Sequence, residues 1–342
     1  MTPADPPRFS SEPDQEPASD DQADAAASQL NEFVVAATDA GQRLDVVLAN
    51  GFAQHSRSRL QRWLKAGQIR VDGQSLPAKY KVLGGEFIEL LADEVPDSVD
   101  TDAVRAQPIE FDIVYRDDDL LVINKPAGLV MHPAPGNQDG TVMNGLLALN
   151  PALAAVPRAG IVHRLDKDTT GLFVVAQSLR AHTSLVEQLQ TRTMGREYAA
   201  VVQGELVAGA TIDAPIGRHP VDRKRMAVVA GGRTAITHYR VLRHLRGFTY
   251  INVKLETGRT HQIRVHLAHL KHALVGDQVY GGRRRLPAGY DPDARETIAA
   301  FPRQALHAHT LSLQHPDHGE TCRWSVPLPD DIENLLALME PQ

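Results

Sequence analysis

Residues 163–171 carry the densest group of polar side chains in the chain, HRLDKDTTG, and they separate two apolar runs. A loop between buried strands is where a sheet presents catalytic groups. An aspartate is ordinarily ionised at neutral pH, and a neighbouring arginine favours the charged form. The segment therefore predicts a loop that presents an ionised carboxylate for chemistry. The alternative is a surface turn in which Asp166 and Asp168 pair with Arg164 and Lys167.

A second polar cluster, ETGRTHQIRVH, covers residues 256–266. Ile263, Leu267 and Leu270 recur at helical spacing, which predicts a helix over residues 260–270 that is buried along this line. Four histidines in and after this segment could suggest a metal site: His261, His266, His269 and His272. No acidic ligand accompanies them and their spacing matches no common zinc pattern, so we expect ordinary histidines and no metal.

Sequence motifs for common cofactors are missing. The chain contains no GxxxxGK, GxGxxG, HExxH, GxSxG or CxxC pattern, so ATP, dinucleotide and serine-hydrolase chemistry lose their usual support. Its single cysteine, Cys322, permits no internal disulfide, which fits a reducing compartment. The sequence shows neither a run of about 18 apolar residues nor a signal peptide. We therefore expect a cytoplasmic protein without a cofactor or a membrane span.

The formal charge of −6 is unevenly distributed. Residues 1–31 hold seven acids and one arginine and account for all of it, so the rest of the chain is neutral. Because residues 1–31 contain almost no large apolar side chains, we expect them to form a disordered acidic tail. Residues 93–107 are also acidic and are expected to form a linker. The composition, 42% apolar and 23% charged, is that of a globular protein of one or two domains.

A small basic unit lies between the tail and the linker. Residues 41–92 contain eight basic and four acidic residues. In the helix predicted over residues 56–66, Leu60, Trp63 and Leu64 share one face. The basic side chains of this helix are those of Arg57, Arg59, Arg62 and Lys65. One face of the helix should pack, and the other should meet solvent or phosphate.

The same unit continues with two short predicted strands, residues 68–71 and 87–91, the first followed by an Asp-Gly turn. Three segments resemble the S4 RNA-binding domain: GQRLD at 41–45, SRSR at 56–59 and GQIRVDG at 67–73. The resemblance implies an S4-like domain over residues 32–92 whose basic helix contacts RNA through Arg57, Arg59, Arg62 and Lys65. An isolated helix of this pattern would instead indicate a solvated face.

The remainder, residues 108–342, mixes short strands with fewer helices. Strands are expected at residues 120–123, 172–176, 198–203, 237–242 and 250–255, and helices at residues 142–148, 181–190 and 260–270. Because these elements do not alternate regularly, we predict an α+β fold with a mixed, largely antiparallel central sheet.

Six segments of this remainder occur in order: NKPAGLVMHP at 124–133, HRLDKDTTG at 163–171, REY at 196–198, GRTHQIRVH at 258–266, VGDQVYG at 275–281 and LHA at 306–308. They resemble the RluA family of RNA pseudouridine synthases, most of all the members that act on large-subunit rRNA. The resemblance implies a catalytic domain that isomerises uridine to pseudouridine in 23S rRNA or its precursor, and so supports ribosome maturation. We expect this enzyme to act as a monomer.

In that family the aspartate of the HRLD segment is the nucleophile, which implies this role for Asp166. The reaction breaks the N1–C1′ bond of uridine and rejoins the uracil through C5 without net hydrolysis or redox change, so a carboxylate suffices. The resemblance implies that Arg264 pairs with Asp166, and that Tyr198 stacks on the flipped base and could accept the proton from C5. It also implies that Arg164 enters the RNA where the base has flipped, and that Ile263 forms an apolar wall beside Asp166. These residues do not distinguish attack at C1′ or C6 from a glycal route.

Residues 218–246 form the most basic segment of the chain, with seven arginines and one lysine against one aspartate. Because arginine makes forked contacts with phosphate, this composition favours RNA contact over a merely solvated face. Part of the segment resembles the RNA-gripping loop of the family, which implies contacts from Arg218, Arg223 and Arg225.

Two other functions fit the same residues. One is an RNA-binding or ribosome-assembly protein whose active site is idle. The other is a nucleoside or glycoside hydrolase that uses Asp166 with Asp168. Hydrolysis needs two carboxyl groups set roughly 5 to 10 Å apart, which two neighbours on one loop do not ensure. Release of free uracil from RNA would identify the hydrolase.

Overall fold

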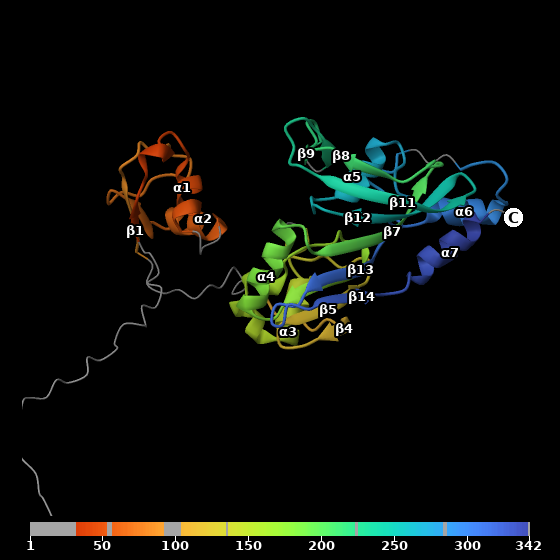
Figure 1. The fold of residues 1–342 in the computed structure, drawn as a ribbon, viewed down its shortest axis with the longest axis horizontal. Helices are drawn as coiled ribbons and strands as arrows, with labels where there is room; N and C mark the ends of the chain where they lie inside the picture. The colour runs from red at the N-terminus through yellow and green to blue at the C-terminus, as the bar shows by residue number, and fades with distance from the viewer. Residues whose placement is uncertain are drawn as a thin grey trace, which may run out of the picture. The chain divides into compact units, whose positions relative to one another are not determined.

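The computed structural model describes residues 32–52, 57–91, 104–134, 136–222, 225–282 and 286–340. The chain divides into two compact units, residues 1–95 and residues 96–342, which are described separately (Figure 1). The expected acidic tail and most of the expected linker lie outside the described residues, so the predicted domain limits stay predictions. Among the described helices, none is long and apolar enough to cross a membrane.

The N-terminal unit packs two helices against a three-stranded sheet. Its elements are β1 (Glu32–Val34), a 3-10 turn (Ala37–Asp39), α1 (Leu44–Gly51), α2 (Arg57–Lys65), β2 (Ile69–Val71) and β3 (Phe87–Leu90). β3 lies between β1 and β2 and is antiparallel to both. The predicted apolar face of α2 is buried, with Leu60, Trp63 and Leu64 in the core. Asp72 and Gly73 have φ of +48° and +74° and form the expected turn after β2.

The larger unit is built on one nine-stranded sheet. Its strands are β4 (Asp112–Arg116), β5 (Leu120–Lys125), β6 (Thr170–Ala176), β7 (Gly195–Gln203), β8 (Ala210–Asp213), β11 (Ile236–Leu245), β12 (Phe248–Leu255), β13 (Leu306–Gln314) and β14 (Thr321–Ser325). The order is β4-β5-β6-β13-β7-β12-β11-β8, and β14 also pairs with β13. Among these pairs only β13 with β6 is parallel, which confirms the predicted mixed, largely antiparallel sheet. A separate hairpin consists of β9 (Ile216–Arg218) and β10 (Met226–Val228).

The helices of this unit are α3 (Val142–Leu149), α4 (Leu179–Gln190), α5 (Gln262–His269), α6 (Pro292–Ala300) and α7 (Asp330–Met339), with 3-10 turns at Pro151–Ala155 and Pro157–Gly160. Side chains that accept backbone N–H groups fix three of the helix starts: Thr141 before α3, Ser178 before α4 and Asp291 before α6. α3 and α4 both contact the 3-10 turn at Pro157–Gly160, α4 also contacts β6, and Figure 1 shows α6 beside α7 near the C-terminus.

The polar loop at residues 163–169 leads directly into β6. Every position of β6 is buried, as in a strand that is covered on both faces. At its second residue, Gly171, φ is +111°, and a Cβ atom there would come within 2.3 Å of the backbone oxygen of Ala308 in β13. Only glycine allows β6 and β13 to approach so closely, and this approach fixes the end of the polar loop.

Candidate active site

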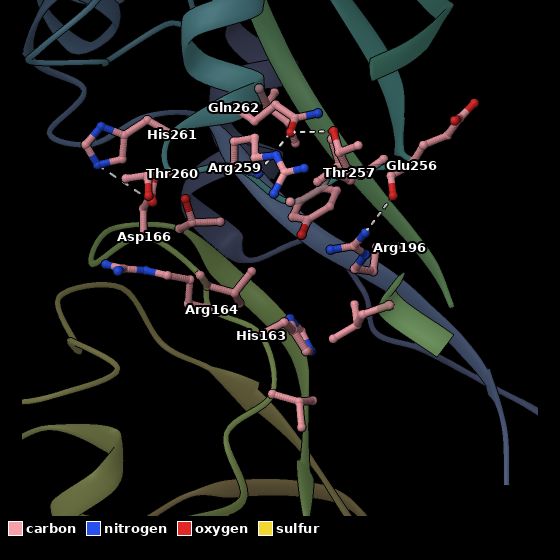
Figure 2. A pocket seen from close by; sticks show the side chains of 18 of the residues that line it. His163, Arg164, Asp166, Arg196, Glu256, Thr257, Arg259, Thr260, His261 and Gln262 are labelled. Carbon is pink, nitrogen blue, oxygen red and sulfur yellow. Dashed lines mark hydrogen bonds and ion pairs between the residues drawn. The ribbon is translucent and has the colours of Figure 1, made fainter. Parts of the chain in front are cut away.

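A cavity of about 650 Å³ lies where the loop at residues 163–169, strand β7 and the start of α5 meet. The residues of the predicted catalytic centre all line it: Arg164, Asp166, Tyr198, Ile263 and Arg264. Figure 2 shows the carboxylate of Asp166 rising from the loop toward the α5 side of the cavity, whereas Arg164 extends to the side. Sequence segments far apart along the chain therefore form one site.

Asp166 is held by Arg264. The Nη1 of Arg264 donates a hydrogen bond of 3.0 Å to Asp166 Oδ2. Its Nε and Nη2 donate to both oxygens of Asp277, at 2.7 and 3.0 Å. Burial alone would lower the pKa of Arg264, but the contacts with Asp277 and Asp166 outweigh it and raise the pKa further. A permanent positive charge in fixed orientation therefore faces Asp166.

Tyr198 is buried on β7, two residues after the buried Arg196 and on the same face of the strand. Burial raises the pKa of Tyr198; Arg196 opposes this effect and Asp166 adds to it. Tyr198 is therefore a neutral phenol at pH 7. Figure 2 shows Arg196 directed at the segment that enters α5, where it donates to the carbonyl of Glu256 at 3.3 Å.

Two buried basic side chains hold the loop that carries Asp166. Lys125 Nζ donates to the carbonyl of Lys167 at 2.8 Å and to two carbonyls of its own loop. Arg303 Nη1 donates to the carbonyl of Asp168 at 3.2 Å, while its Nε and Nη2 bind both oxygens of Asp331 in α7. These bonds fix two successive carbonyls of the loop, those of Lys167 and Asp168.

The alternative interpretations of the loop can be compared with this geometry. Asp166 pairs with Arg264 and not with its sequence neighbours, so the loop is no simple turn of surface ion pairs. Asp166 lines the cavity but Asp168 does not. This arrangement weighs against a hydrolase that uses the carboxylates of Asp166 and Asp168 together. His163, although it belongs to the polar segment, accepts the N–H of Val174 through Nε2 and has a structural role.

The histidines after residue 260 do not converge. His266 uses both ring nitrogens for contacts with Thr237 and the carbonyl of Ala214. His272 contacts the carbonyl of Gln203, and His269 is exposed. In the part of the chain that the structure describes, no group of three or more His, Cys, Asp or Glu side chains is placed to hold a metal ion.

The structure describes only some of the side chains that the sequence predicts to contact RNA. Lys65 is exposed on α2, but the side chains of Arg57, Arg59 and Arg62 and the whole of Arg223 lie outside the described residues. Arg218 is exposed on β9. Arg225 packs over the ring of Tyr280, at 5.2 Å from its centroid.

The basic segment at residues 218–246 is not one surface patch. β11, which contains its second half, has 10 residues and is about 33 Å long. At the far end of this strand Arg243 pairs with Glu340, and Arg246 donates to the carbonyl of Gly289. RNA contact over this segment stays a prediction.

Among the residues around the site, Lys125, Asp277 and Arg303 had no role assigned from the sequence. Lys125 and Asp277 belong to the segments NKPAGLVMHP and VGDQVYG, which were noted for their order only. A single acidic residue in a glycine-containing segment, such as Asp277, gives little indication in the sequence that its partner is a buried arginine. For Arg303 no sequence signal was available, because its partners are mostly backbone carbonyls.

Comparisons with known proteins identify the family. The family model for RNA pseudouridylate synthase matches residues 119–269, and the S4 domain model matches residues 42–88. The chain is 54% identical over 299 residues to "Ribosomal large subunit pseudouridine synthase D" of Pseudomonas aeruginosa, covering 87% of this chain and 92% of that protein. It is 50% identical to the protein of the same name from Xanthomonas campestris pv. campestris, covering 94% and 96%.

Among solved structures, human RNA pseudouridylate synthase domain containing 1 aligns with a TM-score of 0.52 and 28% identity, over 68% of this chain and 89% of that one. Sequence and structure therefore agree, and the chain belongs to the RNA pseudouridylate synthase family, as an RNA pseudouridine synthase with an N-terminal S4 domain.

Proposed function

We propose that this enzyme converts uridine to pseudouridine in large-subunit (23S) rRNA or its precursor, with Asp166 as the nucleophile. The observation that carries the proposal is the placement of Asp166 against Arg264 in a cavity of about 650 Å³, large enough for a flipped nucleoside. The substrate class is supported by the relatives, whose names assign them to the large ribosomal subunit.

The residues of the cavity account for the steps of the isomerisation. The N1–C1′ bond breaks, the uracil turns, C5 bonds to C1′, and the C5 proton leaves while N1 gains one. Asp166 supplies the carboxylate, and Arg264 stabilises its charge. Because Tyr198 is a buried neutral phenol, its ring is suited to stacking on uracil more than to acting as a base. Ile263, which is also buried, supplies an apolar wall.

Basic side chains at the cavity and elsewhere on the chain would hold the RNA. Arg164 is exposed at the cavity, two residues before Asp166, where it can occupy the space that a flipped uridine leaves. Arg218 and Arg225 would contact phosphates beside the cavity, and Lys65 with the other bases of α2 would bind a second region of the RNA. The proposal also includes the monomer expected from the sequence, and rRNA as substrate implies the cytoplasm.

The test uses full-length protein and 23S rRNA transcript, with pseudouridine mapped by site. Asp166→Asn should give no pseudouridine, while the Kd for RNA stays within about twofold and the Tm is little changed. The fold should persist because Arg264 keeps its two bonds to Asp277. Asp168→Asn, on the same loop, is the matched control and should stay active. Normal pseudouridine formation by Asp166→Asn, or release of free uracil by the wild type, would reject the proposal.

A further inference from the structure

His261 immediately precedes α5 with an unusual backbone. Its φ is +56°, and its side chain does not cap the helix. Six non-glycine residues in the described chain have positive φ, and three of them line the cavity: Arg158, Arg192 and His261. A left-handed conformation costs about 1 to 3 kcal/mol at residues other than glycine, and such residues are concentrated at functional sites. The backbone at His261 therefore points to a role for its side chain.

The hydrogen bonds of Tyr280 determine which ring nitrogen of His261 carries the proton. The hydroxyl of Tyr280 accepts the N–H of Met226 at 3.0 Å, and it lies 2.9 Å from His261 Nδ1. The hydroxyl has one hydrogen to donate, and in the described structure Nδ1 is the acceptor that it reaches. We therefore assign Nδ1 as the acceptor, which leaves the hydrogen of the neutral ring on Nε2.

The charge state of His261 agrees with this assignment. Burial lowers the pKa of His261, and Arg264 and Arg164 add to this effect although Asp166 opposes it. The imidazole is therefore neutral near pH 7, with one N–H group. That N–H group belongs to Nε2, which lies 3.9 Å from Asp166 Oδ1. Figure 2 shows the ring edge directed at the carboxylate.

We propose that His261 is a positioning residue for Asp166, whose Nε2–H directs Oδ1 while Arg264 holds Oδ2. The proposal rests on the nucleophilic role proposed for Asp166. A carboxylate held at one oxygen still rotates, because the last side-chain torsion of aspartate is broad. A second donor removes this freedom. The present 3.9 Å is longer than a hydrogen bond, and such contacts often tighten only when substrate binds.

Two substitutions at His261 distinguish the effect of losing the Nε2–H donor from the effect of changing the left-handed backbone. His261→Asn suits the left-handed backbone, since asparagine tolerates positive φ, but its amide is too short to reach Asp166. His261→Gln places an amide N–H near the position of Nε2. His269→Gln, at the exposed end of the same helix, is the matched control. Tyr280→Phe removes the hydroxyl that orients the ring.

The experiment measures kcat and KM for pseudouridine formation in a 23S rRNA transcript, together with the Tm of each full-length variant. We expect His261→Asn to lower kcat about 10- to 100-fold with KM within twofold, since a misplacement of about 1 Å at a reacting group costs up to about 100-fold. His261→Gln should recover most of the wild-type kcat. The kcat of Tyr280→Phe should lie between those of His261→Asn and the wild type, and the kcat of His269→Gln should equal that of the wild type.

Three results would overturn the assignment: full kcat in His261→Asn, no recovery in a folded His261→Gln, or a rise in KM with kcat unchanged, which would indicate direct RNA contact. Asp166→Asn is assayed in parallel. If it forms pseudouridine, the proposed nucleophile is wrong whatever the His261 variants do, so the two failures can be told apart.

Discussion

Arg264 Nη1 lies 3.0 Å from Asp166 Oδ2, although the two residues are 98 positions apart in the sequence. The guanidinium cannot turn away, because its Nε and Nη2 are fixed on Asp277, whose side chain is 1% exposed. The ring of Tyr280 lies under the guanidinium, at 5.1 Å from its centroid. The direction of the contact between Arg264 and Asp166 is thus set by a buried ion pair behind it.

Asp277→Asn should therefore weaken both the fold and the chemistry. Burial by itself would raise the pKa of Asp277, but its contacts with Arg264 and with two backbone N–H groups keep that pKa lowered, so the native side chain is a carboxylate. Breaking a buried pair leaves an uncompensated charge and costs about 3 to 5 kcal/mol. We expect a loss of this size in the free energy of unfolding from urea titration, and a lower kcat.

The matched control for Asp277 is Asp317, which pairs with Arg180 where both side chains are more than half exposed. Exposed pairs contribute at most about 1 kcal/mol, so Asp317→Asn should change the free energy of unfolding by less than that. Equal losses in the two variants would contradict the special role of the pair behind Asp166.

Gly171→Ala tests the contact that fixes the end of the polar loop. The added Cβ would meet the backbone oxygen of Ala308 at 2.3 Å, and alanine is strained at φ +111°. Together these effects should lower the free energy of unfolding by about 2 to 4 kcal/mol and reduce kcat by displacing Asp166. Gly128→Ala has a positive φ of +84° but open space around it, so it should cost about 1 kcal/mol and leave kcat unchanged.

The sequence predicted local structure well where apolar periodicity is strong. The helix expected over 142–148 is Val142–Leu149, and the strand expected over 250–255 is Phe248–Leu255. The helix expected over 260–270 begins later, at Gln262, because His261 adopts a left-handed backbone that periodicity does not reveal.

The contacts of the site were less accessible from sequence. Family resemblance, and not spacing, indicated the pair of Asp166 with Arg264, since the order of residues along a chain does not determine which loops meet. The bonds of Lys125 and Arg303 to backbone carbonyls involve no particular partner residue type, so no sequence pattern reports them. Charge along the chain likewise did not reveal that the fold pairs Arg243 with Glu340.

A pH-dependent contribution to stability is expected from Asp117. Burial by itself would raise its pKa, but hydrogen bonds from Tyr115, His315 and two backbone N–H groups outweigh burial and lower the pKa to about 2. A carboxyl group whose pKa is lower in the folded than in the unfolded state stabilises the fold above its unfolded pKa, near 3.8. That stabilisation is lost as the pH falls toward 2.

Asp117→Asn should therefore reduce the free energy of unfolding by about 2 kcal/mol at pH 7, and the difference from the wild type should shrink below pH 4 and vanish near pH 2. Urea titrations at several pH values measure it. Asp112→Asn, which replaces an exposed carboxylate that accepts a hydrogen bond of 2.8 Å from the Asn124 amide, serves as the control and should change the free energy of unfolding at pH 7 far less. A constant difference for Asp117→Asn across this range would show that lost hydrogen bonds, and not ionisation, explain the effect.

Lys65 tests whether the basic side of α2 contacts phosphate. Its side chain is exposed, while Leu64 beside it is buried in the N-terminal unit, so the lysine is free to reach a partner outside that core. Each phosphate contact contributes about one unit to the slope of log affinity against log salt concentration. Lys65→Ala should therefore reduce the slope for 23S rRNA binding by about one unit. Lys254→Ala is the matched control, because Lys254 is exposed on the sheet face opposite Tyr198, and it should leave the slope unchanged. An unchanged slope in Lys65→Ala would place this side of α2 in solvent.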